Sequence, residues 1–382
     1  MEETAPSEPV HNASVVSKMS WLDRLLPLNI LIVMVVGTLL GHYVPSAAPA
    51  INSGSIVGVS VPMLIGLLWM MYPVLCQVKF EKLSTIVREK SATRIIIFSL
   101  LVNVILAPLF MLCLAWATLP DLPHERAGII LVAVGRCIAM VLIWNNLAGG
   151  DAEWCAILVA VNAVVQLALF GPIAYFLTSV IGGGDNGMVS IWLVVRSVLV
   201  FLGVPLVLGA ATRGVLRWVA GAKWYDEKFL PFIEPHAVIG LLYTILIMFI
   251  LQGNSIIHDI PNALRTAVPL ILYFPSVFSL TFIASLYILE SPFHIAVTQS
   301  FTATGNNFEL TIAVAVATYG IESKEAFASV VGSLIEVPVL LSLVYLSKWW
   351  ENWYNTVLSR RKLQFESINL LRTKETEIVL PE

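Results

Sequence analysis

Two short polar segments lie in the middle of hydrophobic runs that are long enough to cross a lipid bilayer. The first polar segment, Gly135-Arg136-Cys137, interrupts the run 127–149, and the second polar segment, residues 302–309, interrupts the run 293–320. A charge at bilayer depth costs at least about 2.5–3.5 kcal/mol, so such residues usually line a pathway or pair with one another inside a bundle. One segment offers a thiol and the other a carboxylate. This combination indicates a substrate site and a site for a coupling ion.

The composition identifies the class of protein that must position these segments. Hydrophobic residues make up 58% of the chain, charged residues 12%, and the mean hydropathy is +0.85. Soluble domains carry about 25% charged residues, so this chain has roughly half the usual charge. The pattern predicts an all-α polytopic membrane protein. The net charge of −3 gives no reason to expect a nucleic-acid partner.

No cofactor is expected from the sequence. The four cysteines form no CxxC pair, which argues against a disulfide framework or a cysteine metal site. The glycine-rich stretch 182–187 lacks the lysine and the strand-to-helix context of a nucleotide-binding loop. Transport would therefore be driven by an ion gradient or by a partner ATPase.

Polar segments divide the chain into ten apolar runs. A helix needs about 20 apolar residues to cross the hydrocarbon core. Very short links join runs four and five, eight and nine, and nine and ten, so these neighbours must be antiparallel. The ten runs are 25–45, 55–75, 95–118, 127–149, 154–181, 189–212, 236–252, 267–290, 293–320 and 325–349.

The distribution of basic residues predicts that both termini are cytosolic. With the N-terminus inside, 17 of the 22 Lys and Arg residues fall on the inner side. Only Arg126, Arg265 and Lys324 fall on the outer side, and Arg136 and Arg196 lie within runs. This asymmetry satisfies the positive-inside rule.

The ten runs also divide into two sets of five. An odd number of spans per half makes the second half inverted relative to the first, as in many secondary transporters. The two polar segments then occupy corresponding fourth runs, where interrupted helices often form the transport site. The predicted organisation is a polar cytosolic tail (1–20), a first five-helix repeat (21–181), a linker (182–188), a second repeat (189–350) and a polar, solvated cytosolic tail (351–382).

Four strings in these runs resemble the arsenite efflux permeases of the bile/arsenite/riboflavin transporter superfamily. The resemblance covers roughly residues 20–350. It implies ten helices in two inverted repeats, with broken, crossed fourth and ninth helices. It also implies extrusion of trivalent arsenic, with antimonite as a further substrate, in exchange for protons. The strings are Gly135-Arg136-Cys137-Ile138-Ala139-Met140-Val141, Trp144-Asn145, Asn306-Asn307-Phe308-Glu309-Leu310 and Leu334-Ile335-Glu336-Val337-Pro338.

Given that resemblance, Cys137 is the candidate ligand for As(III). Arsenite is an uncharged trihydroxide at neutral pH, and its soft arsenic centre prefers thiolate ligands. A single thiol forms one exchangeable bond, and the neighbouring Arg136 would favour the thiolate. The alternative is a small packing residue, because buried free cysteine is common, with Arg136 paired to a carbonyl or carboxylate.

Glu309 and Glu336 are the candidate proton carriers. Glu309 lies near the midpoint of the ninth run, and Glu336 lies near the centre of the tenth, two residues before Pro338. Burial disfavours the charged carboxylate and so makes proton loading possible near neutral pH. Alternatively, Glu309 forms a salt bridge with Arg136 or Arg196, and Glu336 is a structural partner of Arg196.

Amide side chains complete the predicted substrate site. Asn145, Asn162 and Gln166, together with Asn306 and Asn307, can donate to or accept from arsenite hydroxyls. For the first three, hydrogen bonding between helices is the alternative role. The chain departs from the usual permease pattern at Asn146 (often aspartate), Ser333 (often proline) and Gly135 (often alanine), which bears on coupling and on the helix break rather than on the substrate class.

Two other functions compete with arsenite/proton antiport. A sodium-coupled organic-anion symporter of the bile-acid type needs a cluster of acidic and polar sodium ligands and has no need of Cys137. A membrane enzyme using Cys137 as nucleophile needs a base within hydrogen-bond reach, and neither polar segment contains a histidine. We therefore expect a transporter of the plasma membrane, with the membrane of an acidic internal compartment such as a vacuole as the alternative. The sequence leaves the oligomeric state open.

Overall fold

The computed structural model describes residues 25–52, 54–56, 58–78, 90–138, 140–181 and 191–378, and this part of the chain is almost entirely helical. One two-stranded hairpin interrupts it, β1 (Ser55–Ile56) with β2 (Val59–Ser60), in the register Ser55↔Ser60. The helices, with π-helical segments labelled η, are α3 (Leu26–Tyr43), α4 (Ala47–Ile51), α5 (Val61–Gln77), α7 (Lys90–Leu100), η1 (Leu101–Leu106), α8 (Ala107–Thr118), α9 (Pro123–Val134), α10 (Met140–Ala148), α11 (Ala152–Tyr175), η2 (Phe176–Ile181), α12 (Ile191–Val198), η3 (Leu199–Gly203), α13 (Val204–Val219), α14 (Ala222–Trp224), η4 (Tyr225–Phe229), α15 (Leu230–His258), α16 (Ile260–Tyr287), α17 (Phe293–Thr304), α18 (Phe308–Tyr319) and α19 (Lys324–Ile378).

Six continuous helices in the described part of the chain are long and apolar enough to cross a membrane. Three shorter apolar helices accompany them, at Leu28–Tyr43, Val61–Gln77 and Phe308–Tyr319. The prediction of a polytopic helical membrane protein is therefore confirmed, while the count of ten remains a prediction. The six are Ala92–Thr118, Ala152–Ile181, Ile191–Val219, Ala222–Asn254, Ile260–Tyr287 and Lys324–Tyr354.

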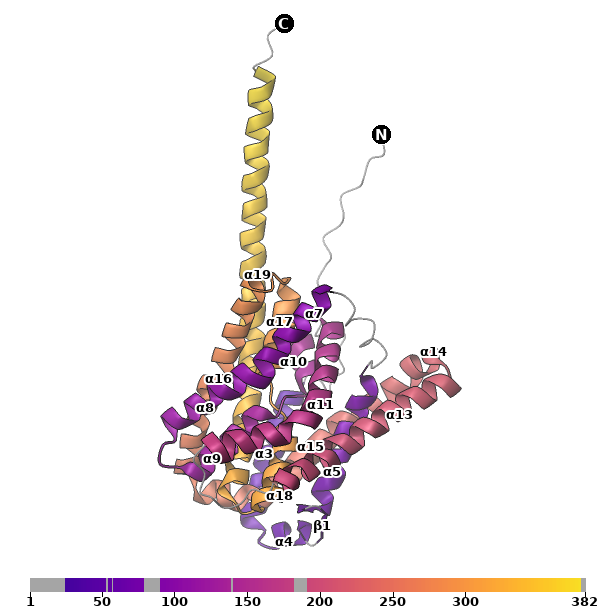
Figure 1. Cartoon of the computed structure of the whole chain (residues 1–382), viewed down its shortest axis with the longest axis vertical. Coiled ribbons are helices and arrows are strands. Elements are labelled where there is room, and N and C mark those ends of the chain that lie inside the picture. Colours follow the sequence, from indigo (N-terminus) through magenta and orange to yellow (C-terminus); the bar gives the residue numbers. More distant parts are fainter. Residues whose placement is uncertain are drawn as a thin grey trace.

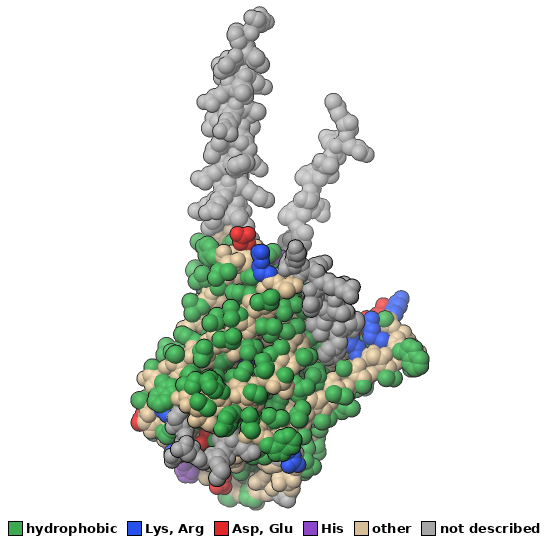
Figure 2. All heavy atoms as spheres, in the orientation of Figure 1, with side chains coloured by type: hydrophobic (Ala, Val, Ile, Leu, Met, Phe, Trp, Pro, Cys, Tyr) green, Lys and Arg blue, Asp and Glu red, His purple; other side chains and the backbone are tan. Residues whose placement is uncertain are grey.

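The surface has the distribution of side chains that a bilayer requires. Figure 2 shows hydrophobic side chains covering most of this face, with Lys, Arg, Asp and Glu confined largely to its ends. Large apolar residues are exposed on the described part of the molecule in numbers that a soluble protein could not tolerate, for example Val207, Leu264 and Leu280, which are 66%, 66% and 59% exposed.

Both runs that carry a polar segment are broken helices. In the fourth run, α9 ends at Val134 and α10 begins at Met140. In the ninth, α17 ends at Thr304 and α18 begins at Phe308. The backbone at both C-caps, Gly135 and Gly305, is extended. Irregular backbone at membrane depth is tolerated only where it is buried in protein or lines a cavity, so these breaks mark the candidate site.

Three of the four π-helical segments share a sequence cause. The segments η1, η3 and η4 each end two residues before a proline, at Pro108, Pro205 and Pro231 respectively. Proline has no N–H, so the carbonyl four residues earlier loses its α-helical donor. The residue after each segment instead donates to the carbonyl five residues back, for example Ala107 to Val102. π-helical turns recur at functional sites, and η1 presents Asn103 toward the helix break described below.

The helices form two packed groups. One consists of α3, α5, α13 and α15, in which α15 packs against α3 and α5. In the other, α19 packs against α9, α16 and α18, and α17 packs against α16 and α11. The close approach of α3 to α15 depends on Gly41 and Gly253, because a Cβ at either would lie within 2.5 Å of a carbonyl oxygen of the other helix.

Helical structure extends beyond two of the predicted runs. After run six, α13 continues to Val219, and helical structure resumes at Ala222, before run seven begins. In the predicted cytosolic tail, α19 continues as far as Ile378, so this helix projects beyond the others at the top of Figure 1. Polar sequence alone does not end a helix, and no Pro or Gly follows Pro338 within α19. The predicted linker 182–188 and tail 1–20 lie outside the described residues.

Candidate functional site

The two helix breaks meet each other and pair through their main chains. Arg136 and Asn306 form an antiparallel bridge. The N–H of Cys137 donates to the carbonyl of Gly305 at 3.1 Å, and the N–H of Asn307 donates to the carbonyl of Gly135 at 3.0 Å. The broken helices thus satisfy each other's freed backbone groups, which the bilayer could not do. We call this meeting point, residues 135–138 and 305–307, the crossing.

Side chains complete the hydrogen bonding of the crossing. Gln166 on α11 accepts from the N–H of Arg136 at 2.8 Å and donates to its carbonyl at 2.9 Å. The amide of Asn306 donates to the carbonyls of Val132 and Gly135. Gln166 was predicted to bind substrate, but both ends of its amide are occupied by the main chain of Arg136. Its position fits a structural role at the break.

The Arg136 guanidinium binds the ends of both half-helices. Its Nη1 donates to the carbonyl of Ala303 at 2.8 Å and to the hydroxyl of Tyr273 at 3.1 Å, and its Nη2 donates to the carbonyl of Ala133. A cation is favoured at a helix C-terminus, where the last carbonyls lack intrahelical donors. All three of these partners are neutral groups, so the alternative of a backbone-bonded arginine fits better than a carboxylate pair.

Cys137 lies inside the crossing, with an exposed fraction of 5%. Its sulfur accepts a hydrogen bond from the N–H of Val141 at 3.3 Å, at the start of α10. Gly305 lies directly beside it, because a Cβ at Gly305 would stand 3.0 Å from the Cβ of Cys137 and 3.8 Å from its sulfur. The thiol is therefore held between one half-helix and the backbone break of the other.

The two candidate proton carriers flank this thiol. Glu309 and Glu336 are 8% and 2% exposed, and both lie within electrostatic range of Cys137 and of each other. The Oε1 atom of Glu336 accepts from the N–H of Asn306 at 3.1 Å, which ties α19 to the crossing. Glu309 stands in the first turn of α18, whose N-cap Asn307 accepts from the N–H of Leu310 at 3.0 Å. A helix N-terminus favours a carboxylate.

The remaining predicted amides lie around the crossing rather than in one cluster. Asn145 on α10 accepts from the hydroxyl of Thr298 on α17 at 2.8 Å. Asn162 on α11 accepts from Asn103 on η1 at 3.4 Å. Asn145, Asn162 and Asn307 are all buried, and the amide nitrogen of each has no hydrogen-bond partner among the described residues. These donors remain free to bind another molecule.

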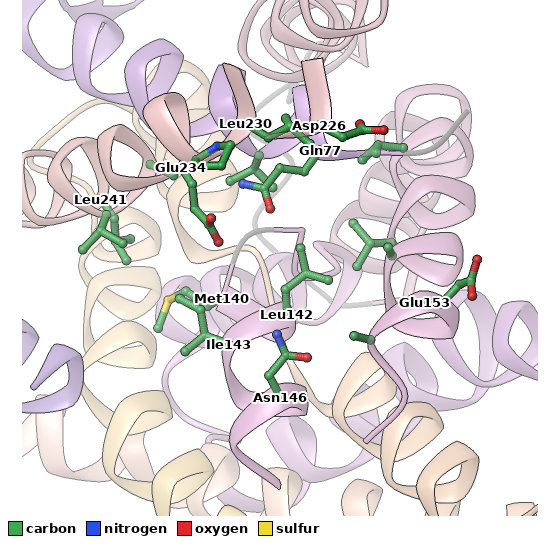
Figure 3. A pocket seen from close by; sticks show the side chains of 18 residues that line it. Gln77, Met140, Leu142, Ile143, Asn146, Glu153, Asp226, Leu230, Glu234 and Leu241 are labelled. Carbon is green, nitrogen blue, oxygen red and sulfur yellow. The ribbon is translucent and has the colours of Figure 1, made fainter. Parts of the chain in front are cut away.

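A cavity of about 520 Å³ lies against α10, the half-helix that follows the crossing. Met140, three residues after Cys137, forms part of its wall. Figure 3 shows Gln77 and Glu234 entering from one side, opposite Met140 and Asn146 on α10. Asn146, noted above for its departure from the permease pattern, thus faces this cavity. The wall comes from the ends of α5, α11 and α15 together with η4 and α10.

The structure does not bring every predicted residue to the crossing. Arg196 lies on the exposed face of α12, so its predicted pairing with Glu309 or Glu336 is not supported by the geometry. The apolar run around it gave no indication of which helix face turns inward. Conversely, Tyr273, Thr298 and Asn103 contact site residues and were not predicted. Each is an ordinary residue of an apolar run, and only the packing of distant helices brings it to the site.

Comparison with known proteins agrees with this geometry. Residues 64–259 match the Sodium Bile acid symporter family. The chain is 41% identical over 338 residues to the arsenical-resistance protein Acr3 of Corynebacterium glutamicum, covering 87% of this chain and 90% of that protein. It is 31% identical over 355 residues to the uncharacterized transporter slr0944 of Synechocystis (88% and 91% covered). It is 29% identical over 350 residues to Acr3 of Alkaliphilus metalliredigens (89% and 96% covered).

These matches cover nearly the whole chain, including both broken helices. They confirm the resemblance inferred from the motifs, and they favour a transporter over an enzyme. The chain therefore belongs to the sodium bile acid symporter family of membrane transporters and is similar to its arsenical-resistance members.

Proposed function

We propose that the protein extrudes arsenite from the cytosol in exchange for protons, with antimonite as a further candidate substrate. The observation that carries this proposal is the buried thiol of Cys137, held at the crossing of two broken helices within electrostatic range of two buried carboxyl groups. Similarity to arsenical-resistance proteins over most of the chain supports the same substrate.

The thiol supplies reversible binding. Its sulfur forms a bond to arsenic, one arsenic–oxygen bond breaks, and the thiol proton leaves with the departing hydroxyl as water. The reverse reaction, in which water attacks arsenic and the proton returns to sulfur, releases arsenite. Because only one As–S bond forms, the complex exchanges far more readily than a three-thiol site would. The free amide nitrogens of Asn145 and Asn307 are candidate donors to the remaining arsenic hydroxyls.

Glu309 and Glu336 supply the proton. Two carboxyl groups in one low-dielectric site resist double ionisation, so one of them stays protonated. That protonated carboxyl group can give its proton to the departing hydroxyl while the other, ionised carboxylate takes up the thiol proton, so that one water leaves and the pair still holds one proton. A proton taken from the outer side and released inside would then be exchanged for one arsenite per cycle.

The cavity supports an inward-facing access route. We infer ten helices in two inverted repeats, with both termini in the cytosol. Under that topology the C-terminal end of α5, the N-terminal ends of α11 and α15, and η4 all lie at the cytosolic side, and these are the ends that line the cavity. Arsenite would enter there and reach Cys137 past Met140. The plasma membrane is the proposed location.

A sodium-coupled organic-anion symporter remains the second candidate, because the matching family is described by that activity. Uptake of arsenite into everted membrane vesicles separates the two. With an acidified lumen, wild type should accumulate arsenite in potassium and in sodium buffer alike, and collapse of the proton gradient should stop uptake.

Variants assign the roles. Cys137→Ser should abolish uptake. Cys113→Ser should not, because Cys113 is exposed on α8 and is not part of the crossing. Glu309→Gln and Glu336→Gln should each remove the dependence on the proton gradient. Uptake that requires sodium, or that survives Cys137→Ser, would reject the proposal and favour the symporter.

A further inference from the structure

A second, much smaller cavity lies on another side of the crossing. It measures about 20 Å³ and is lined by polar groups from two helices and the crossing: Asn103 on η1, Asn162 and Gln166 on α11, and Arg136 at the crossing. Apolar side chains form the rest of its wall, among them Val165 and Phe170. It shares no residue with the larger cavity, whose wall includes Met140.

Three buried polar atoms of these lining residues have no hydrogen-bond partner among the described residues. They are Oδ1 of Asn103, Nδ2 of Asn162 and Nε of Arg136. The residues are only 1%, 3% and 2% exposed. A buried polar atom without a partner costs about 1–3 kcal/mol, and more when the group is charged. Three such atoms around one cavity indicate a ligand that accepts two hydrogen bonds and donates one.

The size of the cavity identifies the ligand. A water molecule needs roughly 10–15 Å³ of such space and two to four polar partners. The cavity therefore fits one water and excludes arsenite, whose arsenic atom carries three hydroxyl groups. We propose that a resident water binds here, accepting from Arg136 and Asn162 and donating to Asn103.

This water gives the Nε atom of Arg136 a hydrogen-bond partner. The other guanidinium nitrogens already bind Ala133, Ala303 and Tyr273, and Nε is the group that those contacts leave over. Asn103 is therefore a positioning residue that acts on Arg136 through the water. Pro108 contributes indirectly, because the π-helical turn before it sets the register that turns Asn103 inward.

Radiolytic hydroxyl labelling after rapid mixing into H₂¹⁸O tests for the water directly, using the full-length protein in nanodiscs. A bound water activated by X-rays labels side chains in contact with it. Phe170 lines the cavity, and Phe278 is an equally buried phenylalanine outside it. Phe170 should be labelled severalfold faster than Phe278. Equal, background labelling of both would overturn the proposal.

Variants test the assigned partners. Asn103→Leu keeps the volume but removes the acceptor, and Val165→Ile adds a methyl group to the cavity wall, so both should reduce Phe170 labelling to the level of Phe278. Ser99→Ala is the matched control, because Ser99 accepts from the amide nitrogen of Asn103 and not from the oxygen assigned to the water. Unchanged labelling in both test variants would reject this site.

The positioning role has its own readout. If the proposed arsenite transport is correct, Asn103→Leu should lower the maximal uptake rate by about tenfold, the effect of one hydrogen bond to a charged group, with KM little changed. Asn103→Asp retains an acceptor and should recover most of the rate. Equal rates for all three proteins would refute the positioning role. If wild type carries no arsenite, the proposed function fails while the labelling result still stands.

Discussion

Arg136 and Asn306 pair as an antiparallel bridge at the centre of the two helix breaks. Each break supplies donors and acceptors to the other, so neither half of the chain can form the site alone. The same pairing brings Cys137 on one break against Gly305 on the other. A substitution in the break that contains Gly305 should therefore alter the packing of the Cys137 thiol in the other break, which the first prediction tests.

Gly305→Ala should impair the thiol site without disturbing the backbone. The residue is extended, with φ −66° and ψ 135°, which alanine adopts readily. Its Cβ, however, would lie 3.0 Å from the Cβ of Cys137, and overpacking of this kind costs about 1–3 kcal/mol. We expect arsenite uptake to fall at least about tenfold, because a cost of about 1.4 kcal/mol corresponds to a factor of ten.

Gly214→Ala is the control for that change, because a Cβ there meets nothing within 4 Å. It should leave uptake unchanged and stability equal or slightly higher. Normal uptake by Gly305→Ala would show that the contact with Cys137 is not needed in the transport cycle.

Gln166→Met should destabilise the crossing. The substitution is close in volume but removes both hydrogen bonds to the main chain of Arg136, leaving a buried N–H and a buried carbonyl unpaired. Each unpaired group should lower the free energy of unfolding by about 1–3 kcal/mol, and thermal unfolding in nanodiscs measures this loss. Gln299→Met removes one side-chain bond, to the carbonyl of Ile95, and should cost less. An effect of Gln166→Met no larger than that of Gln299→Met would contradict the structural role.

Thr298→Val should loosen the attachment of α10 to α17. The Thr298 hydroxyl donates to Asn145 at 2.8 Å and accepts from the N–H of Asp151 at 2.8 Å, so valine leaves both groups unpaired. We expect a loss of about 1–3 kcal/mol per group in unfolding free energy. Thr318→Val makes the same chemical change where the hydroxyl has no partner in the described part of the chain. It should be neutral or stabilising, and equal losses in both variants would count against this account.

Asp121 and Arg265, which form an exposed ion pair, should give a small pH-dependent contribution to stability. Hydrogen bonds from the Arg265 guanidinium, including one of 2.9 Å, lower the pKa of the Asp121 carboxyl below its usual value of 3.8. A lowered folded-state pKa stabilises the protein above the unfolded-state pKa, and this contribution disappears as pH falls through the folded-state pKa.

The comparison is between wild type and Asp121→Asn. Wild type should have the higher Tm at neutral pH. The difference should vanish once the pH falls below the lowered pKa of Asp121, and it should shrink in high salt, since the pair is exposed. A difference that persists unchanged at acid pH would show that the carboxylate charge is not its source.

Much of the site could be predicted because a bilayer makes polar residues conspicuous. Arg136, Cys137, Glu309 and Glu336 stand out in apolar runs, and a run containing such residues beside glycine is a candidate for a helix break. The resemblance of the surrounding strings then indicated the substrate. Tyr273 and Thr298 gave no such signal, since hydroxyl side chains are common in membrane helices.

The sequence by itself determined the class of protein, the two broken runs and the candidate residues for binding arsenic or carrying a proton, because hydropathy and side-chain chemistry are local properties. Only the tertiary structure decided that Gln166 bonds the main chain of Arg136, that Arg196 faces outward, and that Asn103 reaches the crossing. These facts depend on the rotation of each helix about its axis and on contacts between distant segments. An apolar run does not show which of its faces meets lipid and which meets protein. It therefore carries little information about the rotation of its helix or about its distant contacts.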